Sequence, residues 1–147
     1  MKRFSFRLDS ILDYRRYLEK RAQRDLVNAH SEQARRKKVA KELGDKREEI
    51  SKKCSDETFK GIDVPSYHLY TSFLRILNQD LEKAHMSLKQ GEEKIRAHEA
   101  VLKTKSIEKK SLEILKEMQF KEYKLTRERA EQKAVDELVI MRRGHKA

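Results

Sequence analysis

The sequence has no Trp, one Cys, one Pro and four Gly, and its longest apolar runs are three or four residues. The single cysteine, Cys54, cannot form the disulfide framework of a small secreted protein. Because Pro and Gly are scarce, the sequence lacks the turn-forming residues that all-β and α/β domains need. A bilayer span takes roughly 20 apolar residues, so no membrane-spanning helix is expected.

The first ten residues carry charge on both sides of two Phe and show no apolar core of a secretory signal. Together with the lone cysteine, this predicts a protein of the reducing cytoplasm. The length of 147 residues predicts one domain.

Long helices account for what the sequence is rich in. Ala, Glu, Lys, Leu and Arg supply 78 of the 147 residues, a usage typical of coiled coils. Leu, Ile, Val and Phe number only 34, enough to fill one narrow seam between helices but too few for a compact core. The composition predicts an all-α fold.

The only cluster of helix breakers lies at residues 55–66, with Gly61 and Pro65. We therefore expect one coiled-coil domain over residues 1–147, with a helix at about 4–54, a turn at about 55–66 and a helix at about 67–142. A short turn makes two helices antiparallel. The second helix is the longer one, and its last part should extend beyond the end of the first.

The second helical stretch has the clearest pattern. Two rows recur every seven residues, which is the seam of a left-handed coiled coil. They are Leu74, Leu81, Leu88, Ile95 and Leu102, and Tyr70, Leu77, Ala84, Gly91 and His98. The first stretch is less regular, because Gln33, Arg36 and Arg47 occupy expected seam positions. Gly91 is either a site of close helix approach or a tolerated weak point.

Centring the turn near residue 60 places Leu43 opposite Leu77 and Leu8 opposite Leu112. The helix beyond about residue 115 then has no partner within the chain, although its apolar residues continue to Val139 and Ile140. An amphipathic helix with an uncovered apolar stripe needs a surface to bury it. Another protein or a second copy could supply that surface.

The motifs of catalysis and cofactor binding are missing. There is no glycine-rich phosphate loop, and the five His lack the spacing of a metal site on a helix. We expect no enzyme activity, no cofactor and no metal. The net charge of +11 favours an anionic partner, but the run Arg35–Lys38 encircles its helix and has no aromatic residues between its charges. Nucleic acid is therefore not an expected partner.

Both ends of the sequence resemble the FliJ family of the bacterial flagellar type III export apparatus. The N-terminal residues that carry the resemblance are Phe4, Phe6, Arg7, Leu8, Ile11, Leu12, Arg15, Arg16, Glu19 and Ala22. The C-terminal ones are Leu112, Leu115, Glu122, Tyr123, Arg129, Glu131, Gln132, Lys133, Asp136, Glu137, Leu138 and Arg142. Length, hairpin architecture and basic charge agree, so the resemblance covers essentially the whole chain.

The resemblance implies a non-catalytic, stalk-like adaptor at the cytoplasmic face of the inner membrane. Its implied partners are the hexameric export ATPase, the cytoplasmic domain of the membrane export gate, and export chaperones. The implied ATPase contacts are Phe4, Phe6, Leu8, Phe120, Tyr123, Arg129, Gln132 and Asp136. The implied gate contacts are Phe73, Leu77, Asp80 and Ala84, where Asp80 stands in place of a small apolar residue.

Three other readings remain open at this point. The chain could be the equivalent coiled-coil stalk of a virulence type III secretion system, whose architecture is the same. It could be a basic coiled-coil arm that binds RNA, or a scaffold built from several copies of itself.

Overall fold

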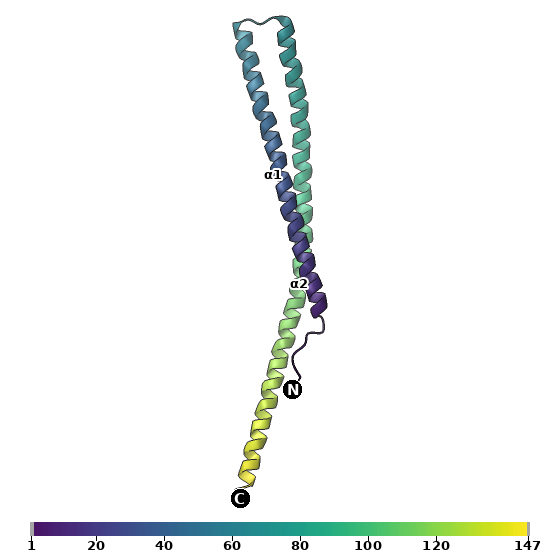
Figure 1. Ribbon diagram of the computed structural model, residues 1–147, viewed down its shortest axis with the longest axis vertical. Helices are drawn as coiled ribbons and strands as arrows, with labels where there is room; N and C mark the ends of the chain where they lie inside the picture. Colours follow the sequence, from purple (N-terminus) through teal and green to yellow (C-terminus); the bar gives the residue numbers. More distant parts are fainter. Residues whose placement is uncertain (1, 147) are drawn as a thin grey trace. The chain divides into compact units, whose positions relative to one another are not determined.

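The computed structural model describes residues 2–146 and contains two α-helices, α1 at Asp9–Lys60 and α2 at Val64–Gly144 (Figure 1). They pack against each other in opposite directions, which confirms the predicted antiparallel hairpin with a longer second helix. The contacts divide the chain into two compact units. We call residues 22–102 the hairpin unit, and residues 1–21 with 103–147 the terminal unit. Both helices contribute to both units, and assignment to a single domain stays a prediction.

The turn is shorter than the twelve residues that the sequence predicts. Only residues 61–63 leave the helical conformation, so α1 continues past residue 54 to Lys60 and α2 begins at Val64. Gly61 has a φ of 94°, a left-handed conformation that ends α1 at low steric cost. Asp63 then caps α2, because its carbonyl accepts the amide of Tyr67 and its carboxylate accepts a hydrogen bond from Ser66. That bond holds the pKa of Asp63 below its ordinary value.

The short turn also changes the pairing of the helices. Phe4 contacts Phe120, and Asp9 forms an ion pair with Lys116. These pairs lie about one helical turn further along α2 than the predicted pairing of Leu8 with Leu112. The predicted helix start at about residue 4 is wrong as well, since residues 2–8 precede α1.

In α2 the predicted seam is confirmed. All ten positions from Tyr70 to Leu102 are buried or half-buried, and Leu77 and Gly91 are the most enclosed. The α1 seam alternates steps of three and four residues from Leu12 to Cys54, as a heptad requires. Its positions are 12, 15, 19, 22, 26, 29, 33, 36, 40, 43, 47, 50 and 54, and of these only Arg47 is fully exposed. Ile11 and Val39 lie off this seam and are exposed.

A polar contact lies in the seam of the hairpin unit. Gln33 is 4% exposed, and its Nε2 donates to the carbonyl oxygen of Leu88 at 3.0 Å. A Cβ at position 91 would overlap Oε1 of Gln33 and lie 2.8 Å from Nη1 of Arg36. Gly91 therefore permits the close approach of Gln33, which decides between the two readings of this glycine.

Candidate partner-binding surfaces

The N-terminal segment, residues 2–8, lies across α2 in the terminal unit. The ring of Phe4 packs edge-on against Phe120 at a centroid distance of 5.2 Å and against Tyr123 at 5.5 Å. The hydroxyl of Tyr123 donates a hydrogen bond to the carbonyl oxygen of Lys2 at 2.8 Å. Phe6 is 4% exposed, and Leu8 is half-buried. The aromatic residues thus lie where the N-terminal segment packs against α2.

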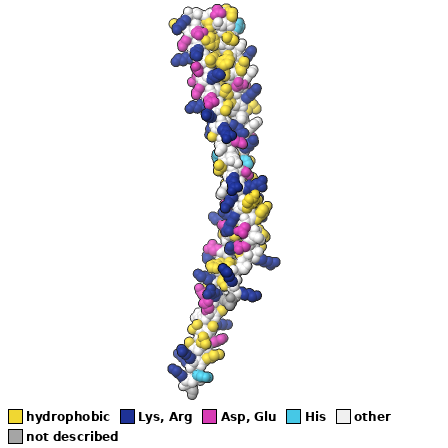
Figure 2. Space-filling view, in the orientation of Figure 1, with side chains coloured by type: hydrophobic (Ala, Val, Ile, Leu, Met, Phe, Trp, Pro, Cys, Tyr) yellow, Lys and Arg dark blue, Asp and Glu magenta, His cyan; other side chains and the backbone are white. Residues whose placement is uncertain are grey.

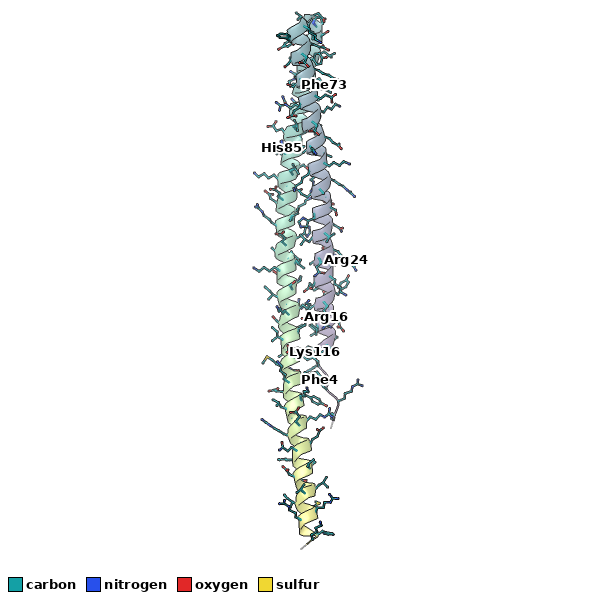
Figure 3. The ribbon with its side chains drawn as sticks, turned by 90° about the vertical axis from the view of Figure 1, so that its left-hand side faces the viewer. Phe4, Arg16, Arg24, Phe73, His85 and Lys116 are labelled. Atoms are coloured by element: carbon teal, nitrogen blue, oxygen red, sulfur yellow. The ribbon has the colours of Figure 1, made fainter. Side chains whose placement is uncertain are left out.

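Charged pairs join the two helices of the same unit. Arg15 and Glu108 approach to 2.6 Å, Glu19 and Lys109 to 2.9 Å, and Asp9 and Lys116 to 2.7 Å. Arg16 reaches Glu113 at 3.5 Å. Lys116 Nζ also lies 5.9 Å from the ring centre of Phe6, and Figure 3 labels Lys116 and Phe4 close together along α2. Charge complementarity and aromatic packing together fix this end of the chain on α2.

Of the residues predicted to contact the ATPase, the structure brings five together and leaves three apart. Phe4, Phe6, Leu8, Phe120 and Tyr123 lie in the cluster around the N-terminal segment, while Arg129, Gln132 and Asp136 follow on α2 and are exposed. The aromatic residues Phe4, Phe120 and Tyr123 of the cluster pack against one another. Phe120 remains 44% exposed. Their role toward a partner stays a prediction.

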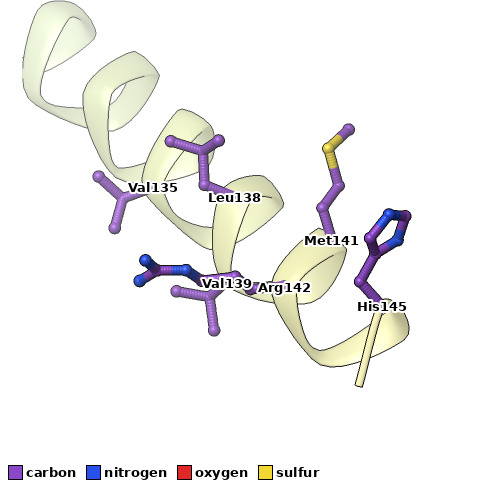
Figure 4. Close-up of a pocket in the computed structure, with 6 residues that line it drawn as sticks. All are labelled: Val135, Leu138, Val139, Met141, Arg142 and His145. Carbon is purple, nitrogen blue, oxygen red and sulfur yellow. The ribbon is translucent and has the colours of Figure 1, made fainter. Parts of the chain in front are cut away.

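The C-terminal segment, residues 124–144 of α2, has no helix packed against it in the terminal unit, and all its side chains are exposed. Figure 2 shows apolar side chains on its surface among Lys, Arg and acidic groups. Figure 4 shows Val135, Leu138, Val139 and Met141 projecting from the last turns, beside Arg142 and His145. Burying such apolar side chains is favourable, so this segment is suited to a partner surface.

The terminal part of α2 carries a second apolar row, which the sequence analysis did not distinguish from the first. Ile107 and Ile114 are 57% and 51% exposed, although α1 lies beside this part of α2. They precede Met118 and Leu125 on the side of α2 away from the seam. The seven-residue spacings 107–114 and 118–125 would have revealed this row in the sequence.

The residues predicted to contact the export gate lie in the hairpin unit and divide into two kinds. Leu77 is 4% exposed and Ala84 half-buried, both in the seam. Phe73 and Asp80 flank the seam and are half-exposed, and Lys46 Nζ lies 5.5 Å from the ring centre of Phe73. A partner approaching this unit from outside would reach Phe73 and Asp80, while Leu77 supports α2 from within.

Two local contacts alter titration. The hydroxyl of Tyr70 is hydrogen-bonded to Glu57 in the hairpin unit, which raises the pKa of the tyrosine. In the C-terminal segment Arg127 donates to Glu131 at 2.8 Å, and this pair raises the pKa of the guanidinium. Both groups titrate far above neutral pH, so neither is a proton donor or acceptor for catalysis near pH 7.

Among residues 2–146, no three His, Cys, Asp or Glu side chains come together in a way that could hold a metal ion. Within the same residues, neither helix contains a stretch long and apolar enough to cross a membrane.

Comparison with known proteins gives one match. No curated protein and no solved structure matches the chain. The family described as flagellar FliJ protein matches residues 4–147, which is nearly the full length and includes both ends that carry the resemblance. The chain belongs to the family of flagellar FliJ proteins.

Proposed function

We propose that this chain is a non-catalytic, stalk-like adaptor of the flagellar export apparatus, which binds the export ATPase through its terminal unit. Family membership supports a component of flagellar protein export. The observation that carries the proposal is the C-terminal segment, whose side chains are all exposed and include Leu138 and Met141 at more than 60% exposure. A helix of this kind gains stability when a partner covers it.

The charges of the terminal unit support an acidic partner. Residues 103–147 carry thirteen Lys or Arg and eight Asp or Glu. An ATPase ring with an acidic inner surface would complement this surplus and steer the helix during association. Arg129, Gln132 and Asp136 are exposed in the middle of the segment and are the proposed polar contacts.

The hairpin unit takes the second role in this proposal. Phe73 and Asp80 would contact the cytoplasmic domain of the export gate, with Leu77 and Ala84 holding their helix in place. The adaptor would then act at the cytoplasmic face of the inner membrane and pass export chaperones to the ATPase. The family match favours the flagellar system over a virulence secretion system or an RNA-binding arm.

The test measures ATP hydrolysis and co-sedimentation of the export ATPase from the same organism with and without this protein. We expect faster hydrolysis and co-sedimentation, and loss of both when Leu138→Asp and Met141→Asp are combined. Both side chains are exposed, so the variant should retain its helical content. The matched control is Ile76→Asp, an exposed apolar position of the hairpin unit, which should leave the ATPase response unchanged. No stimulation and no co-sedimentation by the unmodified protein would reject the proposal.

A further inference from the structure

The exposed row on the terminal part of α2 forms a second heptad seam. From Ile107 onward, its positions alternate steps of four and three residues. They are Ile107, Ser111, Ile114, Met118, Lys121, Leu125, Glu128, Gln132, Val135, Val139 and Arg142. We call these positions the outer seam. Its six apolar members are each at least 45% exposed.

The outer seam faces away from α1. The seam that α1 covers continues in the terminal unit through Lys109, Leu112 and Lys116, which are half-buried. Ile114 and Met118 are respectively two residues after Leu112 and after Lys116, which is about 200° around the helix. They are exposed because α1 and the N-terminal segment lie on the other side of α2. A longer α1 would therefore not cover them, and a further helix is needed.

We propose that the outer seam pairs with the same seam of a second copy of this chain, in antiparallel orientation. A heptad seam is a surface shaped for another helix, since its side chains fit the spaces between those of a facing seam. Residues 111–142 would give a contact roughly 50 Å long at 1.5 Å per residue. The charged residues that flank the seam are complementary to those of a second copy in an antiparallel orientation and repel them in a parallel one.

A parallel arrangement of two copies brings like charges together. In parallel coiled coils, the g residue, which directly precedes an a position such as Met118, Leu125 or Gln132, faces the e residue five places later on the other helix. Glu117 would face Glu122, Lys124 would face Arg129, and Glu131 would face Asp136 of the second copy. All three contacts are repulsive, so the sequence disfavours this orientation.

One antiparallel register pairs opposite charges. With the two-fold axis between residues 126 and 127, Glu122 lies near Arg129 of the second copy, and Lys124 near Glu131. Symmetry makes each pair occur twice. In the same register Ile114 faces Val139 and Met118 faces Val135, so these layers are apolar, while Ser111 faces Arg142 at each end. The central layers are mixed, because Leu125 faces Glu128 and Lys121 faces Gln132, and we expect a reversible dimer.

Neighbouring registers lose this complementarity. A shift by one heptad in one direction sets Glu122 against Glu122 and Lys124 against Lys124 of the second copy. The opposite shift sets Arg129 against Arg129 and Glu131 against Glu131. Like charges across a coiled coil oppose pairing, so the charges specify both direction and register.

The groups involved are free to make these contacts. Within residues 2–146, Glu122, Lys124 and Arg129 form no ion pair and are exposed. Glu131 pairs with Arg127 of its own helix at 2.8 Å and would be shared with Lys124 of the second copy. The proposal stands on this pattern and does not depend on the proposed function, although the dimer would cover part of the surface assigned to the ATPase.

The test measures the mass of the full-length protein alone by sedimentation equilibrium at low and high salt. We expect a reversible dimer that weakens as salt rises. Lys124→Glu should weaken the dimer by about tenfold or more, because both symmetric pairs become repulsive. The exchange Lys124→Glu with Glu131→Lys should restore it, and Lys133→Glu, the same charge change beside the seam, should have a much smaller effect.

Apolar variants give a second measurement. Met118→Asp should weaken the dimer, while Ile140→Asp, another exposed apolar position next to the outer seam, should not. Circular dichroism checks that each variant keeps its helices. A single-chain mass at the highest soluble concentration would overturn the proposal, and so would a dimer that the exchange of Lys124 and Glu131 does not restore.

Discussion

The two units hold their helices together by different means. In the hairpin unit, Gln33 of α1 donates a hydrogen bond to the backbone of Leu88 beside Gly91, Glu57 is hydrogen-bonded to Tyr70, and Lys46 lies over the ring of Phe73. The ion pairs Arg36–Glu32 and Lys53–Glu49 stay within α1. In the terminal unit, four ion pairs join the helices, and Phe4 packs on Phe120. The hairpin unit has a close approach at Gly91, whereas the terminal unit has ion pairs and aromatic packing between its parts. The two units should therefore respond differently to side-chain volume, salt and pH.

The largest effect is expected from added volume at Gly91. Gly91→Val should lower the free energy of unfolding by about 2–3 kcal/mol, because the new side chain overlaps Gln33 and displaces its hydrogen bond. Gly91→Ala should cost less, since Ala gains up to about 1 kcal/mol in helix propensity. Urea unfolding followed by circular dichroism measures both variants.

Combining Gly91→Ala with Gln33→Ala isolates the contact. If Gln33 is the obstacle, the double variant should be more stable than the sum of the two single effects predicts. Additive effects would show that the close approach of Gln33 does not set the register of the hairpin unit.

A smaller effect is expected from salt, and only in the terminal unit. Its four ion pairs are partly exposed, each worth about 0.2–1 kcal/mol, and at about 1 M NaCl the screening length falls to about 3 Å. Amide hydrogen exchange should therefore speed up in residues 12–19 of α1, with little change in residues 29–36. Equal acceleration in both stretches would remove the distinction between the units.

The smallest effect concerns pH at the turn of the hairpin unit. The hydrogen bond from Ser66 lowers the pKa of Asp63 in the folded chain. Its stabilising effect is thus present above the unfolded value of 3.8 and is lost as pH falls through the folded pKa. Asp63→Asn can still cap α2 but cannot titrate, so the protection of amides at the start of α2, corrected for the intrinsic pH dependence of exchange, should no longer fall in acid. Unchanged acid dependence in this variant would assign the titration to another group.

The sequence predicted those features that are visible as periodic apolar residues. The α2 seam from Tyr70 to Leu102 has apolar or small residues at nearly every position, so its spacing identifies it. The α1 seam contains Arg15 and Glu19, which pair with Glu108 and Lys109 of α2, partners that sequence spacing does not reveal. The pairing of the helices was off by about one turn because the turn comprises residues 61–63 and is centred later than the predicted position near residue 60.

The candidate site was predicted in part. The sequence identified aromatic residues at both ends of the chain but not that Phe4 would pack against Phe120 and Tyr123. It attributed the uncovered apolar residues to an α1 that is too short. Ile107 and Ile114 show a further cause, because they are exposed beside α1 on the opposite face of α2. A single helix can carry two seams, and a search for one period finds the stronger seam first.

Gly61 is the one residue of the described chain with a positive φ, so the reversal of chain direction depends on a single backbone conformation. If the connection between α1 and α2 straightened, two molecules could exchange helices, so that α1 of each molecule packed against α2 of the other. The left-handed turn keeps α1 within reach of its own α2. Hairpin formation is therefore a property of each molecule by itself, independent of how much of the protein a cell makes.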